Sequence, residues 1–228
     1  MRSGWTRSSL MRSPEALDSG GPSHAALGAA GLRPMAREDF ALETVELART
    51  LIGCHLLYRG RLLRITETEA YRGGDDPASH AFGGRTRRNA PMFGPPGHLY
   101  VYFTYGMHNC VNVVGAADGE PSGVLLRAGE LLRWDGDSEC LVSDSDNSVL
   151  RSSAVGPGRL GRKVGATVAD SGMDACSPGA AVRLFRDRSA VRPAVGVSTR
   201  IGVSGGEELE WRFFDSGSRL VSRHPGGS

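Results

Sequence analysis

The stretch LLRITETEAY, at residues 62–71, decides the fold. It is rich in β-branched residues and bounded by turn residues, which is typical of a strand. Arg59-Gly60 separates it from a second strand-like run at residues 54–58. The sequence therefore predicts two successive strands joined by a short turn.

Helical and strand patterns alternate outward from this pair. A helix is predicted before it, because Leu42, Val45, Ala48 and Leu51 recur on one helical face. A second helix is predicted at residues 159–164, after Gly156-Pro157-Gly158. Further strands are predicted at residues 99–104, 110–114, 124–127, 182–185 and 210–214. This order of elements predicts a mixed α/β (α+β) fold.

Length and composition limit the class of protein. The chain has 228 residues, of which 39% are apolar and 23% charged, which predicts one globular domain. No run approaches the roughly 20 apolar residues of a membrane-spanning helix, so no membrane partner is expected. Neither a zinc site nor a disulfide framework is expected, and a reducing cytoplasm fits best, because the cysteines lie far apart at Cys54, Cys110, Cys140 and Cys176.

Two segments lack a regular pattern. Residues 1–37 contain Gly, Pro and Ser with little periodicity and are expected to form a disordered tail, in which Met35 offers an alternative start. Residues 131–155 carry five acidic residues against two arginines and are expected to form a flexible insert. The net charge of the chain is +2, so removing this net −3 leaves +5 for the rest.

Basic residues gather at two places outside these segments. One cluster contains Arg85, Arg87 and Arg88, and the other contains Arg159, Arg162 and Lys163. Either cluster suits contacts with phosphate groups or, equally simply, a solvated surface.

The predicted strand at residues 62–70, with Tyr71 directly after it, carries the first candidate chemistry. Alternate residues of a strand share a face, so Glu67, Glu69 and Tyr71 are expected to point the same way. A carboxylate beside an aromatic ring could act as a base that activates water. The alternative is an edge strand whose acids pair with arginine. His80 follows in a loop rich in Gly and Arg, where no second ligand at metal spacing is present.

The predicted hairpin at residues 99–114 carries further candidates. Tyr105 and Met107 lie at its tip, where large side chains serve for partner docking or for wedging between bases. Tyr102 is expected on the opposite face from Tyr105. Asn112 and Arg127 lie on apolar strands and need polar partners, which could be the two glutamates or a ligand.

From Glu67 to Arg127 the chain resembles the alkyladenine (3-methyladenine) DNA glycosylases, in particular their bacterial branch. The resemblance extends over about residues 40–214. The matching pieces are Glu67-Thr-Glu69-Ala-Tyr71, His80, Gly84-Arg85-Thr86, Arg88-Asn89, Met92-Phe93, Pro96-Gly97, Leu99-Tyr-Val-Tyr102, Tyr105-Gly106-Met107, Asn112, Leu125-Leu-Arg127, Gly156-Pro-Gly-Arg-Leu160, Arg200-Ile-Gly202 and Trp211-Arg-Phe213.

The resemblance implies a glycosylase domain over residues 38–220, with a curved antiparallel sheet, surrounding helices and a protruding hairpin. It implies a monomeric enzyme that flips an alkylated or deaminated purine out of double-stranded DNA. The enzyme would hydrolyse the N-glycosidic bond without metal or cofactor and without lyase activity, and leave an abasic site.

The resemblance also assigns roles to residues. Glu69 would be the general base, assisted by Arg127. Tyr71, His80 and Tyr102 would surround the flipped base, with Asn112 as a gate against guanine. Tyr105 would fill the gap left by the extruded nucleotide, with Met107 beside it. The DNA backbone would be contacted by Arg85, Thr86, Arg88, Arg159 and Lys163.

The chain departs from the family pattern at two places. Arg87 stands where the bacterial branch usually has proline. After Arg127, acidic sequence replaces a proline-containing turn and a basic helix. Two alternatives therefore stay open, namely a catalytically silent protein that binds damaged DNA and a hydrolase of free nucleosides.

Overall fold

The fold is given by a computed structural model, which describes residues 22–104, 106–135, 138, 140–143, 154–188 and 191–223. The helices are α1 (His24–Ala29), α2 (Thr44–Thr50) and α3 (Pro157–Val164), with short 3-10 turns at Arg37–Asp39, Ala90–Phe93 and Val168–Asp170. The strands are β1 (Leu32–Pro34), β2 (His55–Tyr58), β3 (Arg61–Arg72), β4 (Leu99–Thr104), β5 (His108–Val113), β6 (Ser122–Asp135), β7 (Cys140–Ser143), β8 (Ala154–Val155), β9 (Val182–Asp187), β10 (Val195–Ser198) and β11 (Arg212–Asp215).

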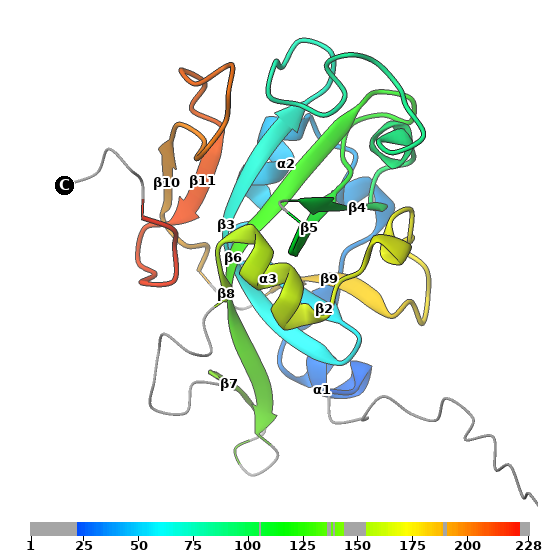
Figure 1. The fold of residues 1–228 in the computed structure, drawn as a ribbon. Coiled ribbons are helices and arrows are strands. Elements are labelled where there is room, and N and C mark those ends of the chain that lie inside the picture. Colours follow the sequence, from blue (N-terminus) through cyan, green and yellow to red (C-terminus); the bar gives the residue numbers. More distant parts are fainter. Residues whose placement is uncertain are drawn as a thin grey trace, which may run out of the picture.

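All described strands join one antiparallel sheet. Its main path runs β1-β9-β2-β3-β6-β5-β4. β11 pairs with β3 and β10 pairs with β11, whereas β7 and β8 both pair with β6. Figure 1 shows β3 and β6 as the long central pair. The predicted α+β architecture with an antiparallel sheet in a single domain is confirmed, and β4 pairs with β5 as expected.

The pairing of β3 with β6 is irregular near Glu67. The register between β3 and β6 shifts between Ile65 and Glu67 and again between Glu67 and Thr68. Bulges of this kind bend a strand and re-aim its side chains, and they are common beside active sites. Here the irregularity lies directly opposite Arg127 of β6, which has no paired residue in β3.

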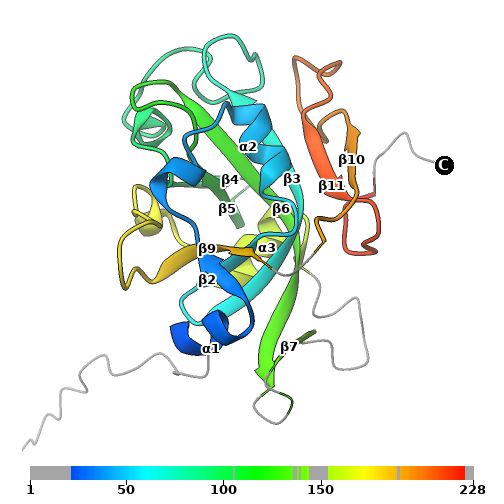
Figure 2. The ribbon, with the colours of Figure 1, turned by 180° about the vertical axis from the view of Figure 1, so that it is seen from behind.

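The two longer helices cover opposite faces of the sheet (Figures 1 and 2). α2 forms where the apolar period predicted a helix, and it buries Leu47 and Ala48 against β3. α3 packs against β5 and β6. Gly161 permits this close approach, because a Cβ atom there would lie 1.9 Å from the carbonyl oxygen of Asn109.

The expectation of a disordered tail through residue 37 is wrong for residues 22–37. α1 and β1 lie within it, and β1 pairs with β9. Leu27 and Leu32 are buried in a second apolar cluster with Leu57, Leu62 and Phe185. Sequence pattern missed this segment because it is too short for a clear period and gains its structure from tertiary contacts. Residues 1–21 lie outside the described part of the chain.

Removal of residues 1–34 is expected to lower the Tm by several degrees. Burial of a leucine contributes about 1.5–3 kcal/mol, and each kcal/mol shifts the Tm of a protein this size by about 2–4 °C. The deletion would also leave the β9 edge unpaired. Thermal unfolding of chains starting at Met35 and at residue 22 measures the effect, because the second chain keeps α1 and β1. Equal Tm values for the two chains would contradict this role.

The flexible insert expected at residues 131–155 is also partly wrong. β6 continues to Asp135 and pairs with β7, in register from Leu132↔Ser143 to Asp135↔Cys140. Leu132 and Leu141 pack against the second apolar cluster, which explains why the strands form despite the acidic sequence around them. Residues 136, 137, 139 and 144–153 lie outside the described part of the chain.

His55 makes the stability of the fold depend on pH. Its side chain is buried, and burial lowers its pKa from 6.5 to about 4, with Arg64 adding to the effect and Asp187 opposing it. Between these pH values His55 is protonated in the unfolded chain but not in the folded chain. The free energy of unfolding therefore falls as the pH drops from about 6.5 towards 4.

The expected loss that His55 causes between pH 7 and pH 5 is about 2 kcal/mol. Urea unfolding at the two pH values, with the His55→Leu variant as comparison, measures it. The variant is expected to lose less stability over this interval, because leucine has no proton to bind. Parallel losses in both proteins would show that other groups cause the dependence.

Candidate active site

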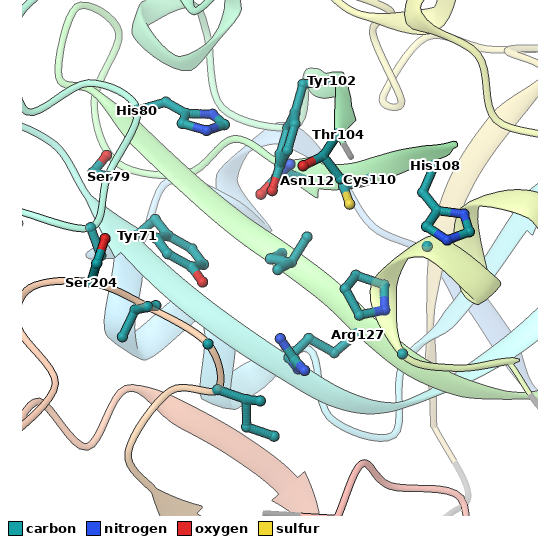
Figure 3. A pocket seen from close by; sticks show the side chains of 18 of the residues that line it. Tyr71, Ser79, His80, Tyr102, Thr104, His108, Cys110, Asn112, Arg127 and Ser204 are labelled. Carbon is teal, nitrogen blue, oxygen red and sulfur yellow. The ribbon is translucent and has the colours of Figure 1, made fainter. Parts of the chain in front are cut away.

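One cavity of about 640 Å³ opens at the end of the central strands. Figure 3 shows Tyr71, His80, Tyr102, Asn112 and Arg127 around it. Strands β3, β4, β5 and β6 supply one part of the wall. The rest of the wall comes from residues 77–80 and 201–204 in loops, from Met92, and from residues 155–159, which run from the end of β8 into the first turn of α3. The cavity therefore brings together the polar candidates that the sequence placed on separate strands.

A fork of buried charges lies beside this cavity. Arg127 donates from Nε to Glu67 Oε1 at 3.0 Å and from Nη1 to Glu69 Oε2 at 3.0 Å. Both glutamates are fully buried, and Arg127 is 6% exposed. Glu67 also accepts from Arg212 Nε at 2.7 Å and from the Ser222 amide at 2.7 Å. The two carboxylates face the same way, as the strand alternation predicted, and two arginines balance their charge.

The Glu69 carboxylate accepts hydrogen bonds at both of its oxygens. The Tyr71 hydroxyl donates to Glu69 Oε2 at 2.9 Å, and the Ile201 amide donates to Oε1 at 2.7 Å. With Arg127 this makes three donors to one carboxylate. A group fixed this way keeps one orientation during a reaction, which is the condition for an efficient general base.

The network favours a charged Glu67 and a neutral Tyr71. Burial opposes charge on Glu67, but Arg127 and then Arg212 outweigh it and lower the pKa of this carboxyl. Burial and the neighbouring Glu69 carboxylate raise the pKa of Tyr71 well above 10. The Tyr71 hydroxyl therefore keeps its proton and remains a hydrogen-bond donor at neutral pH.

Aromatic rings form the opposite part of the site. The His80 and Tyr102 rings meet edge to face, with centroids 4.5 Å apart, and Tyr102 stacks on Tyr100 at 5.4 Å. His80 Nδ1 lies 2.9 Å from the Tyr100 hydroxyl oxygen. Burial and the nearby Arg88 charge lower the pKa of His80, so the imidazole is neutral at pH 7. A flat, partly apolar ligand suits such walls.

Asn112 lies between the aromatic wall and the central strands. Its Nδ2 donates to the Tyr100 carbonyl at 3.0 Å, and its side chain is 4% exposed. It lines the cavity together with Leu125 and Met92. A fixed polar group on an otherwise apolar wall can admit or reject a ligand by its polar substituents.

The remaining candidates differ in their relation to the cavity. Met107 is 71% exposed, and Tyr105 falls outside the described residues. Arg159 lines the cavity at the start of α3, whereas Lys163 is half-buried and does not.

The loop of residues 82–88 is exposed and carries the first basic cluster. Arg88 reaches back from it, donating to the Phe103 carbonyl at 3.3 Å and lying 5.7 Å from the Tyr102 ring centroid. The loop ends in a turn, in which the Thr86 amide donates to Asn89 Oδ1 at 2.6 Å.

Sequence reasoning assigned no role to several residues that shape the site. Cys110 and the 201–204 loop line the cavity, and Arg212 holds Glu67. Arg200 forms a buried ion pair with Asp76 behind Tyr71. The motifs at residues 200–202 and 211–213 were the available signal, but they do not reveal which side chains meet.

Two kinds of feature are absent from the described residues, a membrane-spanning helix and a cluster of metal-ligating side chains. None of the helices described is both long and apolar enough to span a bilayer. Over the same part of the chain, no group of three His, Cys, Asp or Glu side chains is placed to hold a metal ion.

Comparisons with known proteins identify the family. A family model described as methylpurine-DNA glycosylase matches residues 38–219. A protein of Streptomyces avermitilis is 42% identical over 195 residues, covering 83% of this chain and 91% of its own. One of Burkholderia lata is 44% identical over 163 residues, covering 72% and 78%. Both carry the name "Putative 3-methyladenine DNA glycosylase". The chain belongs to the methylpurine-DNA glycosylase family.

Proposed function

We propose that the protein is a DNA repair glycosylase that flips alkylated or deaminated purines from duplex DNA and hydrolyses their N-glycosidic bond. The observation that carries this proposal is the Glu69 carboxylate, fixed by Arg127, Tyr71 and the Ile201 amide beside a cavity with aromatic walls. The names of the relatives support 3-methyladenine as one substrate.

In the proposed reaction Glu69 orients and deprotonates the attacking water. The departing base leaves positive charge on the sugar, as in other glycoside hydrolyses, and the nearby carboxylate stabilises it. Arg127 keeps Glu69 in place and helps to hold the water. The product is an abasic site in the DNA and a free purine.

The walls suit a flipped purine. Stacking on Tyr71, His80 and Tyr102 would return about 1–3 kcal/mol per base, which offsets the cost of flipping. Electron-rich rings also attract a cationic alkylated purine, whereas neutral hypoxanthine would need another source of activation. Asn112 would disfavour the exocyclic amine of guanine.

Residues around the opening would bind the duplex. Tyr105 and the exposed Met107 would enter the minor groove and fill the space of the flipped nucleotide. The positive side chains of the two basic clusters would contact phosphates. The backbone contacts proposed are Arg85, Thr86, Arg88, Arg159 and Lys163.

The enzyme is proposed to be monofunctional, monomeric and active in the bacterial cytoplasm. Lyase activity usually needs an amine nucleophile such as lysine. The only lysine of the chain is Lys163, which is not among the residues that line the cavity.

Single-turnover excision from duplexes with one central hypoxanthine or 3-methyladenine tests the proposal. Release of the purine from the duplex is expected, with none from the free nucleoside. Binding should weaken steeply with salt if phosphate contacts dominate. Tight duplex binding without release of any damaged purine would favour a silent binding protein. Release from nucleosides would favour the nucleoside hydrolase.

A further inference from the structure

A second buried ion pair lies behind the proposed active site. Arg200 donates from Nη1 to Asp76 Oδ2 at 2.6 Å and from Nη2 to Asp76 Oδ1 at 2.8 Å. Both side chains are completely buried. Neither residue is among those that line the cavity. Burying two charges is costly, and well-packed apolar residues often stabilise a fold as well.

Arg200 fixes the strand that carries Tyr71 and Glu69. It donates from Nη1 to the Ala70 carbonyl at 3.0 Å, between these two residues. Its guanidinium lies 4.8 Å from the Tyr71 ring centroid and 5.2 Å from that of Trp211. The cation beside the Tyr71 ring is therefore held by the Asp76 carboxylate, the Ala70 carbonyl and the Trp211 ring.

The same residue places a donor on Glu69. Ile201 follows Arg200 in the chain, and its amide donates to Glu69 Oε1 at 2.7 Å. Arg200 Nη2 also reaches the Gly206 carbonyl at 3.4 Å, which ties down the loop whose residues 201–204 line the cavity.

Asp76 fixes another wall of the cavity. Its Oδ2 accepts from the Arg72 amide at 3.1 Å, and its Oδ1 accepts from the Ala78 amide at 3.1 Å. These bonds shape the turn that leads to Ser79 and His80, both of which line the cavity. One ion pair thus connects the loop bearing His80, the strand bearing Tyr71 and Glu69, and the loop bearing Ile201.

We infer that the Arg200–Asp76 ion pair is a positioning device for the base pocket, which sets Tyr71 and His80 for stacking and the Ile201 amide for holding Glu69. This inference rests on the proposed glycosylase function. Since the pair does not face the cavity, its loss should disturb the geometry of the reaction more than the binding of DNA. A displacement of about 1 Å at a reacting centre can cost about 10²-fold in rate.

The experiment compares Arg200→Gln, Asp76→Asn and the double variant with the wild type. Single-turnover excision of hypoxanthine and duplex affinity are measured on each folded protein. We expect each single variant to excise roughly 10- to 100-fold more slowly, with affinity changed less than about threefold. Because both residues act through one interaction, the double variant should be no slower than the slower single variant. Arg200→Lys, which keeps a cation near Tyr71, should recover part of the rate.

A control removes an ion pair elsewhere in the fold. Arg59, whose side chain is 34% exposed, pairs with the buried Asp170 and donates to the Gly165 carbonyl, and none of these three residues lines the cavity. Arg59→Met is expected to lower the Tm while folded protein keeps its excision rate.

Three outcomes would overturn the inference, provided the wild type excises. The first is a wild-type excision rate in the single variants. The second is a rate loss in the double variant equal to the product of the two single losses. The third is a rate loss in Arg59→Met as large as in the Arg200 and Asp76 variants. If the wild type itself releases no purine, the proposed function fails instead.

Discussion

Replacement of Glu69 by glutamine is expected to lower single-turnover purine release by at least about 10²-fold, the lower end for loss of a general base. Glutamine keeps the shape of the side chain and one acceptor oxygen, which can serve the Ile201 amide, while its NH2 group replaces the oxygen that accepts from Tyr71 and Arg127. It cannot take a proton from water at neutral pH. Duplex binding should survive, because Glu69 is fully buried and lies behind the walls that would hold the base.

The matched variant for this measurement is Glu67→Gln. Glu67 occupies the same strand and shares Arg127, yet its other partners are Arg212 and the Ser222 amide rather than pocket residues. A smaller rate loss is expected there. Wild-type rates in Glu69→Gln, together with a large loss in Glu67→Gln, would transfer the role of base to Glu67.

Replacement of Arg127 by methionine is expected to cost about 3–5 kcal/mol of stability, the range for breaking a buried ion pair from one side. The change leaves Glu69 fully buried without a cationic partner, whereas Glu67 keeps Arg212. Excision should fall as well, since the carboxylate loses one of its three donors. Urea unfolding measures the stability change as a lower midpoint with an unchanged slope.

The control for this variant is Arg64→Met. Arg64 also lies on β3 and pairs with Asp215 at 2.8 Å, but its side chain is 26% exposed. Solvent compensates the partner there, so a loss of about 1 kcal/mol or less is expected. Similar losses in the two variants would mean that Arg127 is not the centre of a buried network.

Much of the fold follows from local pattern. The apolar period of residues 42–52 predicted α2, and the runs at 54–58, 62–70 and 99–104 predicted strands that the structure contains. α2 buries one face, whereas β2 and most of β3 are buried on both faces, so an apolar period marks the helix and short runs between turn residues mark the strands. The strand predicted at residues 124–127 is instead part of the much longer β6, because its outer half is held by pairing with β7.

The family and the candidate residues were also accessible from sequence. The motifs around Glu69, Tyr71, Tyr102 and Arg127 are specific, and the comparisons confirm the family. The structure brings those residues together beside one cavity. Their proposed roles in flipping and hydrolysis stay predictions until excision is measured.

The sequence by itself determined the type of fold, the family and which strands carry the polar candidates, because periodicity and motifs are local properties of the chain. Only the tertiary structure decided that Glu67 and Glu69 share Arg127, that Ile201 holds Glu69, and that Arg200 lies against Tyr71. Arg127 lies 58 residues from Glu69 in the chain, and Ile201 lies 132 residues from it. Strand register decides which side chains meet, and a buried charge is stable only where it meets a partner. Neither condition can be read from a local sequence pattern.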